Sequence, residues 1–498
     1  MKVVRFFLPR ISYILLGAIF LGIAASGPKI LNFDGDLPRH ILFGNLVLQT
    51  KQVPTTDLFS YRTIGKPSTP HEWLSEVFFA LAYNWLGLSG VVLLTALMIA
   101  LAFAIVYWDA NQRSTSLLAA LGFAFLGVIT AAIHFLPRPH IFTFVLLAFW
   151  TFILEKMRKG QIRAWWILPI LMLLWVNLHG MFVLGIAVWL VYLVGALMDR
   201  PASTWKESTE IKTILAGGLV SLPITLLSPS GIGIWGTVFE LAGDSYITSM
   251  IPEYQSANFH EPGTWPFILI LMLAILILSR AKERPFWTHT LLLAAFAGLA
   301  LYSSRMIPIF AILAAPIEAE YFAHWIRSGN WSAKLVAFED RISVVDRTAN
   351  GFIWLVALAA AVTLLFATGQ KIDPQQKGNQ FDPQFFPVNA TEWLKSHPQS
   401  GHMFNDFNWG SYLLFELWPS QQIFIDGHTH IYGDALTREY EDVIALNKNW
   451  DEILNKYQVQ WAILPTDALL VQALKNQGWQ TLYQDSTAII LRQSNASQ

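Results

Sequence analysis

The sequence lacks cysteine altogether and has few charged residues. None of its 498 residues is Cys, which excludes thiolate nucleophiles, cysteine-based metal sites and disulfides, and leaves the redox compartment open. Only 13% of the residues are charged, against about 25% in an ordinary soluble chain. The net charge of −1 indicates no strongly basic surface, so we expect no nucleic-acid partner. Because 54% of the residues are hydrophobic, the composition predicts a polytopic membrane protein.

Apolar runs of nearly spanning length follow one another along the chain. About 20 apolar residues are enough to cross a bilayer as a helix. The runs fall at about 9–29, 89–108, 115–135, 140–157, 164–179, 181–198, 211–228, 264–279, 287–303, 306–321 and 351–368. We therefore predict a mainly α-helical polytopic membrane protein with about eleven transmembrane helices. The first run has a basic start and small residues at its end, as a cleaved signal peptide does, but we favour a retained anchor.

Lysine and arginine mark every second loop between these runs. Lys2, Arg5 and Arg10 precede the first run, and basic residues return in alternate loops up to Arg347. Because cytoplasmic loops carry the excess of basic residues, the N-terminus is predicted in the cytoplasm. For this parity, the alternation of inside and outside loops, to hold, residues 72–86 must not cross the membrane. We expect them to lie on the outer surface as an amphipathic helix.

The same parity defines the outer segments. The large ones are 30–88, 229–263 and the tail from 369, and shorter outer turns lie near 136–140, 178–181 and 303–306. We expect an integral protein of a bacterial inner or plasma membrane, with its C-terminal domain outside the cytoplasm.

The tail from residue 369 differs in character from the membrane domain at 1–368. A stretch rich in Pro, Gln and Asn is typical of a linker. The pattern then predicts strands at 402–405, 422–426, 459–464 and 487–492, and helices at 390–397, 409–417, 435–447, 450–457 and 466–477. The alternation predicts a C-terminal soluble α/β domain over 369–498, with a mainly parallel sheet. It has no Gly-rich phosphate loop, so we do not interpret it as nucleotide-binding.

The unusual polar residues gather on the predicted outer face. Ionisable residues at membrane depth are costly, and a functional role is the first hypothesis for them. They are Asp34, Asp36, Arg39, His40, His71, Glu72, His134, Arg138, His140, Asn177, His179, Glu253, His260 and Arg305. Interfacial charges and helix-end caps remain an alternative explanation for each of them.

This set of side chains suits more than one chemistry. A carboxylate can act as general base or orient a nucleophile. An arginine can bind a phosphate through two hydrogen bonds and neutralise charge on a leaving group. Transfer of a sugar from a lipid-linked phosphate donor at the membrane surface needs both, and no cytosolic nucleotide. Paired aspartates with neighbouring histidines are equally compatible with a divalent cation.

Five short segments, in this order, resemble a known family. They are FDGDLPRH at 33–40, HEWLSEVFF at 71–79, MIPEYQSANFHEP at 250–262, YSSRMIPIFAILAAP at 302–316 and FNDFNWGSYL at 404–413. The layout resembles the C-type, multi-spanning glycosyltransferases that use polyprenyl-phosphate-linked sugars. Within them it is most similar to the catalytic subunit of oligosaccharyltransferase and to the C-mannosyltransferases.

The resemblance implies roles for individual residues. Asp34 or Asp36 occupies the place of the catalytic carboxylate, and Glu253 that of the catalytic Glu on the family's flexible outer loop. Arg305 corresponds to the arginine that contacts the donor phosphate, and we expect Arg138 or His140 to assist it. Acceptor binding is expected from the tail domain, and the remaining outer-face candidates complete the set. The acceptor-binding candidates are Asp406, Asn408, Trp409, Asp426 and His428, and the other candidates are Arg39, His40, His71, Glu72 and His179.

Two departures from the family pattern limit what the resemblance implies. Oligosaccharyltransferases carry acidic metal ligands in the second outer loop, but here that loop reads HFLPRPH at 134–140, where only His140 could substitute. A divalent cation is therefore a possible cofactor that this loop does not support. In the acceptor motif, Asp406-Phe407-Asn408 precedes Trp409, where the family has paired Trp before an Asp. The acceptor, whether glycan, lipid or protein, stays open.

Two other classes of protein fit parts of the pattern. A multi-spanning transporter or lipid flippase would perform no covalent chemistry, but it calls for charges through the membrane midplane and often for paired inverted halves. We find neither halves nor a ladder of charges in the sequence. A non-catalytic assembly protein would only display the tail domain outside. We therefore favour a glycosyltransferase that takes its sugar from a lipid-phosphate-linked donor. The protein is expected to be in contact with membrane lipid.

Overall fold

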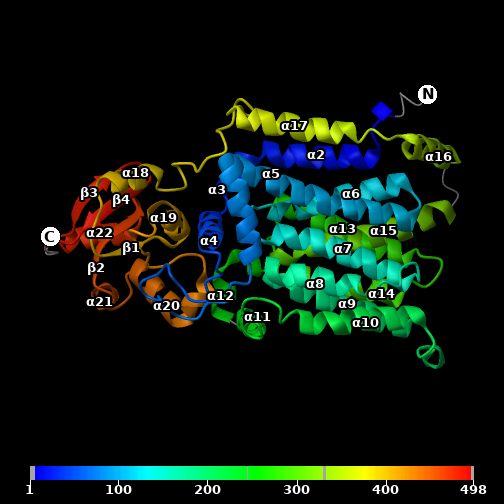
Figure 1. Ribbon diagram of the computed structural model, residues 1–498, viewed down its shortest axis with the longest axis horizontal. Coiled ribbons are helices and arrows are strands. Elements are labelled where there is room, and N and C mark those ends of the chain that lie inside the picture. Colours follow the sequence, from blue (N-terminus) through cyan, green and yellow to red (C-terminus); the bar gives the residue numbers. More distant parts are fainter. Residues whose placement is uncertain (1–5, 244, 329–332, 495–498) are drawn as a thin grey trace. The chain divides into compact units, whose positions relative to one another are not determined.

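The computed structural model describes residues 6–243, 245–328 and 333–494, and it is mostly helical (Figure 1). The chain forms two compact units, which are described separately below. The first comprises Met1–Ser26, Val92–Gly231 and Ile251–Pro374. The second comprises Gly27–Val91, Ile232–Met250 and Gln375–Gln498. The second unit thus joins the tail to most of the two long segments that lie between the predicted spans.

All eleven predicted apolar runs are helical, but eleven spans are not confirmed. In the described part of the chain, six helical stretches have the length and composition to cross a membrane. A seventh forms if α16 (Ala333–Thr348) and α17 (Ile353–Ala367), which are bent by 72°, count as one. The six are Trp73–Ser114, Leu117–His134, His140–Arg158, Gly180–Met198, Pro262–Ser279 and Ser304–Arg327. The apolar helices α2 (Ile11–Ala25), α8 (Ile167–Leu178) and α14 (Trp287–Tyr302) are shorter than this. The protein is nonetheless an integral membrane protein, as its long apolar helices show.

Helix α15 (Ile307–Ser328) lies in the interior of the first unit. Residues 309–315 are all buried, and the helix packs against α6 (Leu117–Ala131), α13 (Trp265–Ser279) and α14. A Cβ added at Gly127 of α6 would lie 3.5 Å from the Ala315 Cβ, so small residues let these two helices approach closely.

Other helices of the first unit complete the bundle. They are α7 (His140–Arg158), α9 (Val183–Met198), α10 (Thr209–Ile224), α16 (Ala333–Thr348) and α17 (Ile353–Ala367). Helices α2 and α17, from opposite ends of the unit's sequence, run side by side (Figure 1). The Gly351 N–H donates to the Leu8 carbonyl oxygen over 2.9 Å, which joins the starts of these two helices.

The second unit begins with helices α3 (Gly27–Asn32) and α4 (Leu37–Thr50), followed by the first part of α5 (Trp73–Ser114). The backbone of α5 leaves helical geometry at Leu86 and Gly87. Gly87 has a φ of 58°, which a glycine adopts without steric cost. A helix over 72–86 was predicted, and α5 is helical from Trp73 to its break at Leu86. Its place on the outer membrane surface stays a prediction. Helices α11 (Gly233–Gly243) and α12 (Ser245–Met250) complete the part outside the tail.

The tail contains a four-stranded sheet with the order β1-β2-β4-β3. Its strands are β1 (His402–Asn405), β2 (Val459–Pro465), β3 (Gln480–Gln484) and β4 (Ala488–Arg492). Strands β1 and β2 are parallel, whereas β2 pairs with β4, and β4 with β3, in antiparallel fashion. The prediction of a mainly parallel sheet is therefore wrong. Strand β3 was not predicted, and its hairpin with β4 supplies one of the two antiparallel pairings.

The strand predicted at 422–426 is absent; only Ile423 forms an isolated bridge, with Ser60. The segment has the apolar composition of a strand, but its N–H groups find other acceptors. The Ile423 N–H donates to the Phe59 carbonyl oxygen (3.1 Å), and the Phe424 N–H donates to Oδ1 of Asn405 (2.8 Å). A side chain at the end of β1 thus takes the place of a ladder partner.

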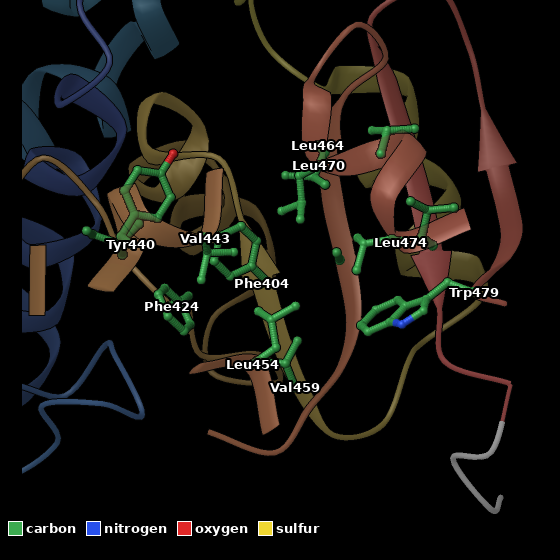
Figure 2. Packing of buried hydrophobic residues seen from close by; sticks show 14 of the residues in the cluster. Phe404, Phe424, Tyr440, Val443, Leu454, Val459, Leu464, Leu470, Leu474 and Trp479 are labelled. Carbon is green, nitrogen blue, oxygen red and sulfur yellow. The ribbon is translucent and has the colours of Figure 1, made fainter. Parts of the chain in front are cut away.

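Helices cover the sheet and close the core of the tail. They are α18 (Val388–Ser396), α19 (Gly410–Leu417), α20 (Thr429–Ile444), α21 (Trp450–Lys456) and α22 (Leu469–Asn476). All five helices predicted in the tail are present, although α20 begins six residues earlier than predicted. Figure 2 shows the core between these helices and the sheet, where Phe404, Val459 and Leu464 of the strands meet Tyr440 and Leu474 of the helices.

Candidate active site

A cluster of charged side chains in the first unit is centred on Glu253. Glu253 lies in the 3₁₀ turn η4 (Pro252–Tyr254), and Arg305 lies in the 3₁₀ turn η6 (Ser304–Met306) directly before α15. The Arg305 Nη1 donates to Glu253 Oε1 over 3.1 Å and to the Tyr254 hydroxyl over 2.7 Å. Arg138 Nη1 lies 3.6 Å from the same carboxylate oxygen. His134 Nε2 lies 3.6 Å from the other oxygen, Oε2. We call Arg138, Arg305, His134 and Glu253 the arginine cluster.

The backbone holds the Glu253 turn in place independently of its carboxylate. The hydroxyls of Ser303 and Ser304 donate to the Glu253 carbonyl oxygen over 3.0 and 3.1 Å. The Ser304 N–H donates to the Gln255 carbonyl oxygen over 2.8 Å. The turn therefore stays against η6 whatever the side chain of Glu253 does.

Glu253 is ionised in this environment. Its side chain is 20% exposed, and burial alone would raise its pKa. The charges of Arg305 and Arg138 outweigh burial and bring the pKa of Glu253 below its ordinary value. The cluster therefore contains two positive guanidiniums around one negative carboxylate.

His140 and His179 lie near the arginine cluster. His140 Nε2 lies 2.9 Å from the His134 carbonyl oxygen, and the two imidazole rings are 4.4 Å apart. His179 Nδ1 lies 2.9 Å from the Thr143 hydroxyl. Asn177 donates from Nδ2 to the Leu173 and Leu227 carbonyl oxygens, which agrees with the alternative that it caps freed backbone where its helix ends.

The second unit holds the other carboxylates of the predicted set. Asp34 is buried, and its Oδ1 accepts a hydrogen bond from the Asp36 N–H over 2.9 Å. This turn leads into α4, where Pro38 stands in the first turn. A Cβ added at Gly427 would lie 2.0 Å from Asp36 Oδ1, so only glycine lets the tail backbone approach this carboxylate.

Arg39 joins this turn to the tail. Its Nε lies 3.0 Å from Asp426 Oδ2, and both side chains are buried. The Tyr432 hydroxyl and the His428 N–H donate to the other oxygen of Asp426, each over 3.1 Å. Burial lowers the pKa of Arg39, but the negative charge of Asp426 more than restores it, so Arg39 is positive.

Histidines extend this contact on the other side of Arg39. Arg39 Nη1 donates to His428 Nδ1, and His428 Nε2 lies 2.6 Å from His430 Nε2. Because a guanidinium can only donate, we assign the His428 proton to Nε2, from which it is donated to His430. Burial, reinforced by the charge of Arg39, lowers the pKa of His428 well below its ordinary value, so this imidazole is neutral near pH 7. The His71 ring lies 5.5 Å from that of His430.

Two further histidine–carboxylate pairs lie close by in the sequence. His40 Nδ1 is 3.1 Å from Glu76 Oε1, and His71 Nε2 is 3.7 Å from Glu72 Oε1. Burial lowers the pKa of His40, but the hydrogen bond and the charge of Glu76 raise it above its ordinary value. The predicted candidates Arg39, His40, His71 and Glu72 thus all engage in polar contacts.

The predicted acceptor motif differs in exposure from residue to residue. Asp406 accepts a hydrogen bond from the Asn408 N–H over 2.9 Å, and burial raises the pKa of Asp406. Asn408 is exposed. Trp409 is buried, and its Nε1 donates to the Phe385 carbonyl oxygen over 2.9 Å.

Sequence reasoning missed two tyrosines that contact these charges, Tyr254 and Tyr432. Tyrosines near span ends are usually part of the interfacial aromatic belt, so neither was singled out. The one available signal was position: Tyr254 directly follows Glu253, and Tyr432 lies six residues after Asp426.

The arginine cluster does not fit a divalent cation. Among the described residues, the one carboxylate of the cluster faces two guanidiniums, which would repel a metal ion. Among the described residues, the one group with three-ligand metal geometry is elsewhere in the first unit, at Glu155, His289 and Glu320. There Arg158 and Lys159 bind the Glu155 carboxylate over 2.7 and 3.3 Å. That group therefore reads as part of a charge-balanced ion-pair network.

This chain is similar to known proteins in its fold and not in its sequence. No protein-family model matches the sequence, and no curated protein matches it. Solved structures do match the fold, at low sequence identity. The oligosaccharyltransferase of Archaeoglobus fulgidus, tethered with an acceptor peptide, has a TM-score of 0.54 and 12% identity, covering 91% of this chain and 69% of that one. The same archaeal enzyme, AglB, in complex with an inhibitory peptide and a dolichol-phosphate, has a TM-score of 0.53 at the same identity and coverage.

A third structure matches nearly end to end. ArnT from Cupriavidus metallidurans, bound to undecaprenyl phosphate, has a TM-score of 0.52 and 13% identity, covering 97% of this chain and 98% of that one. The chain thus shares the fold of these oligosaccharyltransferase and ArnT structures. The fold that the resemblance implied is confirmed.

Proposed function

We propose that this protein is a membrane glycosyltransferase that moves a sugar or glycan from a polyprenyl-phosphate-linked donor to an acceptor. The observation that carries the proposal is the arginine cluster, where Arg138 and Arg305 converge on one carboxylate oxygen. Two guanidiniums directed at one anion form the arrangement that binds a phosphate group. Two proteins of this fold have been solved with dolichol-phosphate and undecaprenyl phosphate, which supports a lipid phosphate as the natural ligand.

The reaction assigns a separate task to each group. The acceptor attacks the anomeric carbon of the sugar, and the bond from that carbon to the phosphate oxygen breaks. The phosphate keeps the electron pair and gains one negative charge, which Arg305 and Arg138 stabilise. The acceptor proton goes to a carboxylate, for which we propose Asp34 or Asp36.

Asp34 and Asp36 differ in ways that bear on this task. The Asp34 carboxylate is buried and binds the Asp36 N–H, so it shapes the turn. The Asp36 side chain does not cap α4, although its position would allow this. Because Asp34 is bound within this turn, we propose Asp36 as the base and Asp34 as the group that orients it.

We assign acceptor binding to the tail. Asn408 is exposed and Asp406 half-buried, which leaves both able to contact a ligand. Trp409 and Asp426 are buried and His428 is half-buried, and we propose that they shape this region rather than touch the acceptor. Under the positive-inside rule the reaction takes place on the extracytoplasmic side of the membrane.

The proposal is tested by Arg305→Ala, Arg138→Ala, Asp34→Ala and Asp36→Ala in the full chain. Each variant should lower transfer from a polyprenyl-phosphate-linked sugar by roughly 100-fold or more. For the arginines, removal of one donor to a developing oxyanion costs this much. For the aspartates, loss of the general base or of the group that orients it costs a similar factor. Arg163→Ala is the matched control, because Arg163 is exposed and lies in another loop. Full activity in all four variants, at normal expression, would refute the assignment.

A further inference from the structure

We infer that Glu253 is a built-in competitor for the phosphate of the lipid-linked substrate. Its carboxylate occupies the position between Arg138 and Arg305 that the phosphate must take, and it returns there after each transfer. The inference rests on the proposed function and adds to it a means of releasing the product. It also changes the role expected of Glu253, from the catalytic Glu that the resemblance implies to a group that clears the phosphate site.

The geometry around Glu253 is that of a bound anion. Oε1 is shared by the two guanidiniums at 3.1 and 3.6 Å, and Oε2 faces the His134 imidazole at 3.6 Å. The Tyr254 hydroxyl accepts a further hydrogen bond from Arg305. A phosphate presents oxygens with similar spacing and the same preference for paired N–H donors. The carboxylate and a phosphate therefore compete for one set of donors.

The turn that carries Glu253 allows its side chain to leave without unfolding. The Ser303 and Ser304 hydroxyls hold the Glu253 carbonyl oxygen, and the Ser304 N–H holds that of Gln255. None of these bonds involves the carboxylate. Rotation of the side chain therefore exchanges the ligand of the two arginines while the backbone of the turn keeps its place.

Charge explains why such a competitor is useful. A phosphodiester donor carries one negative charge, whereas a released phosphate monoester carries about 1.5 to 2 at pH 7. The product thus binds the arginines more strongly than the donor does. A carboxylate that re-enters the cluster weakens product binding and speeds its release.

The test compares Glu253→Gln with the wild-type protein in detergent micelles. Glutamine keeps the size of the side chain but removes its charge. The affinity for undecaprenyl phosphate should rise by roughly tenfold, and turnover should become more sensitive to inhibition by the same lipid. Inorganic phosphate is the second probe and should show a gain in the same direction, because the competition concerns the phosphate group. Glu261→Gln is the matched control on the same loop, where the Glu261 carboxylate binds only the Asn258 amide among the described residues.

Each outcome separates the inference from the function on which it rests. Equal or weaker binding of undecaprenyl phosphate by Glu253→Gln overturns the inference, while Arg305-dependent sugar transfer by the wild type leaves the proposed function intact. A gain for inorganic phosphate alone also overturns it, since the competitor would then act on a free anion. Absence of both lipid-phosphate binding and transfer in the wild type refutes the proposed function itself. Glu253→Asp keeps the charge but shortens the side chain. Its affinity for undecaprenyl phosphate should lie between those of the wild type and Glu253→Gln, and it replaces Glu253→Gln in the test if that variant folds poorly.

Discussion

The contact between Arg39 and Asp426 offers a sharp test of the second unit. Asp426→Asn keeps the shape of the side chain and the acceptor for the His428 N–H and Tyr432 hydroxyl, but it leaves the Arg39 cation without its nearest counter-charge. Both side chains are less than 10% exposed. Removal of one partner from a buried ion pair costs about 3–5 kcal/mol. Because Glu76 and Asp57 also stabilise the Arg39 charge, we expect the lower end, about 3 kcal/mol.

The assay is thermal unfolding of the purified protein in detergent, followed by tryptophan fluorescence. The transition of the second unit should move down by several degrees. Glu392→Gln is the control, because its ion pair with Lys395 is 66% exposed on the Glu side and should contribute less than about 1 kcal/mol. Equal transitions for Asp426→Asn and Glu392→Gln would refute the reasoning and would return Asp426 to the list of groups that contact acceptor.

Three further predictions concern buried and titrating groups. Glu318→Gln should leave the melting midpoint unchanged or raise it, because neither buried carboxylate oxygen of Glu318 has a hydrogen-bond partner in the described part of the chain. Glu155→Gln should lower the melting midpoint, because it leaves buried cations unpaired. The reverse order of midpoints would contradict this. The raised pKa of His40 means that its ion pair with Glu76 stabilises the folded protein fully below pH 6.5, and that this stabilisation is lost as the pH rises through the folded-state pKa. The melting midpoint should therefore fall across this range in the wild type and stay flat in His40→Gln. Parallel profiles would contradict the pairing with Glu76. Chelation with EDTA should leave binding of undecaprenyl phosphate unchanged, because the arginine cluster holds its anion with guanidiniums, and a chelator-sensitive affinity would contradict this.

The membrane helices could be predicted from the sequence because composition alone determines them. Every apolar run became a helix, since a lipid environment leaves the backbone few other ways to satisfy its hydrogen bonds. Their number as spans could not be predicted equally well. Helices such as α8 and α14 are apolar but too short to cross by length alone.

The sheet shows where local patterns fail. The apolar segment 422–426 has strand composition, yet its N–H groups go to Asn405 and Phe59, which lie far from it in sequence. The direction of β4 against β2 likewise depends on a hairpin that local propensity does not specify. Long-range partners of this kind are invisible to a pattern read along one chain.

The candidate site was foreseen in part. The alternation of basic loops placed Arg138, Glu253 and Arg305 on one side of the membrane, and the structure brings their side chains into contact. The sequence could not show that Glu253 would pair with the arginines, because a carboxylate on a loop has no periodicity to reveal its partner. Nor could it show that Trp409 is buried, since a tryptophan fits a core and a ligand site equally well.

The central claim is lipid-phosphate-dependent sugar transfer through Arg305. It is tested most directly by mass spectrometry of cell-envelope glycans and glycoproteins from a deletion strain complemented with the wild-type chain or with Arg305→Ala. The account predicts a glycan that the deletion strain lacks, that the wild type restores and that Arg305→Ala does not, at equal expression. Full restoration by Arg305→Ala, or substrate flux into vesicles with no covalent product, would contradict it.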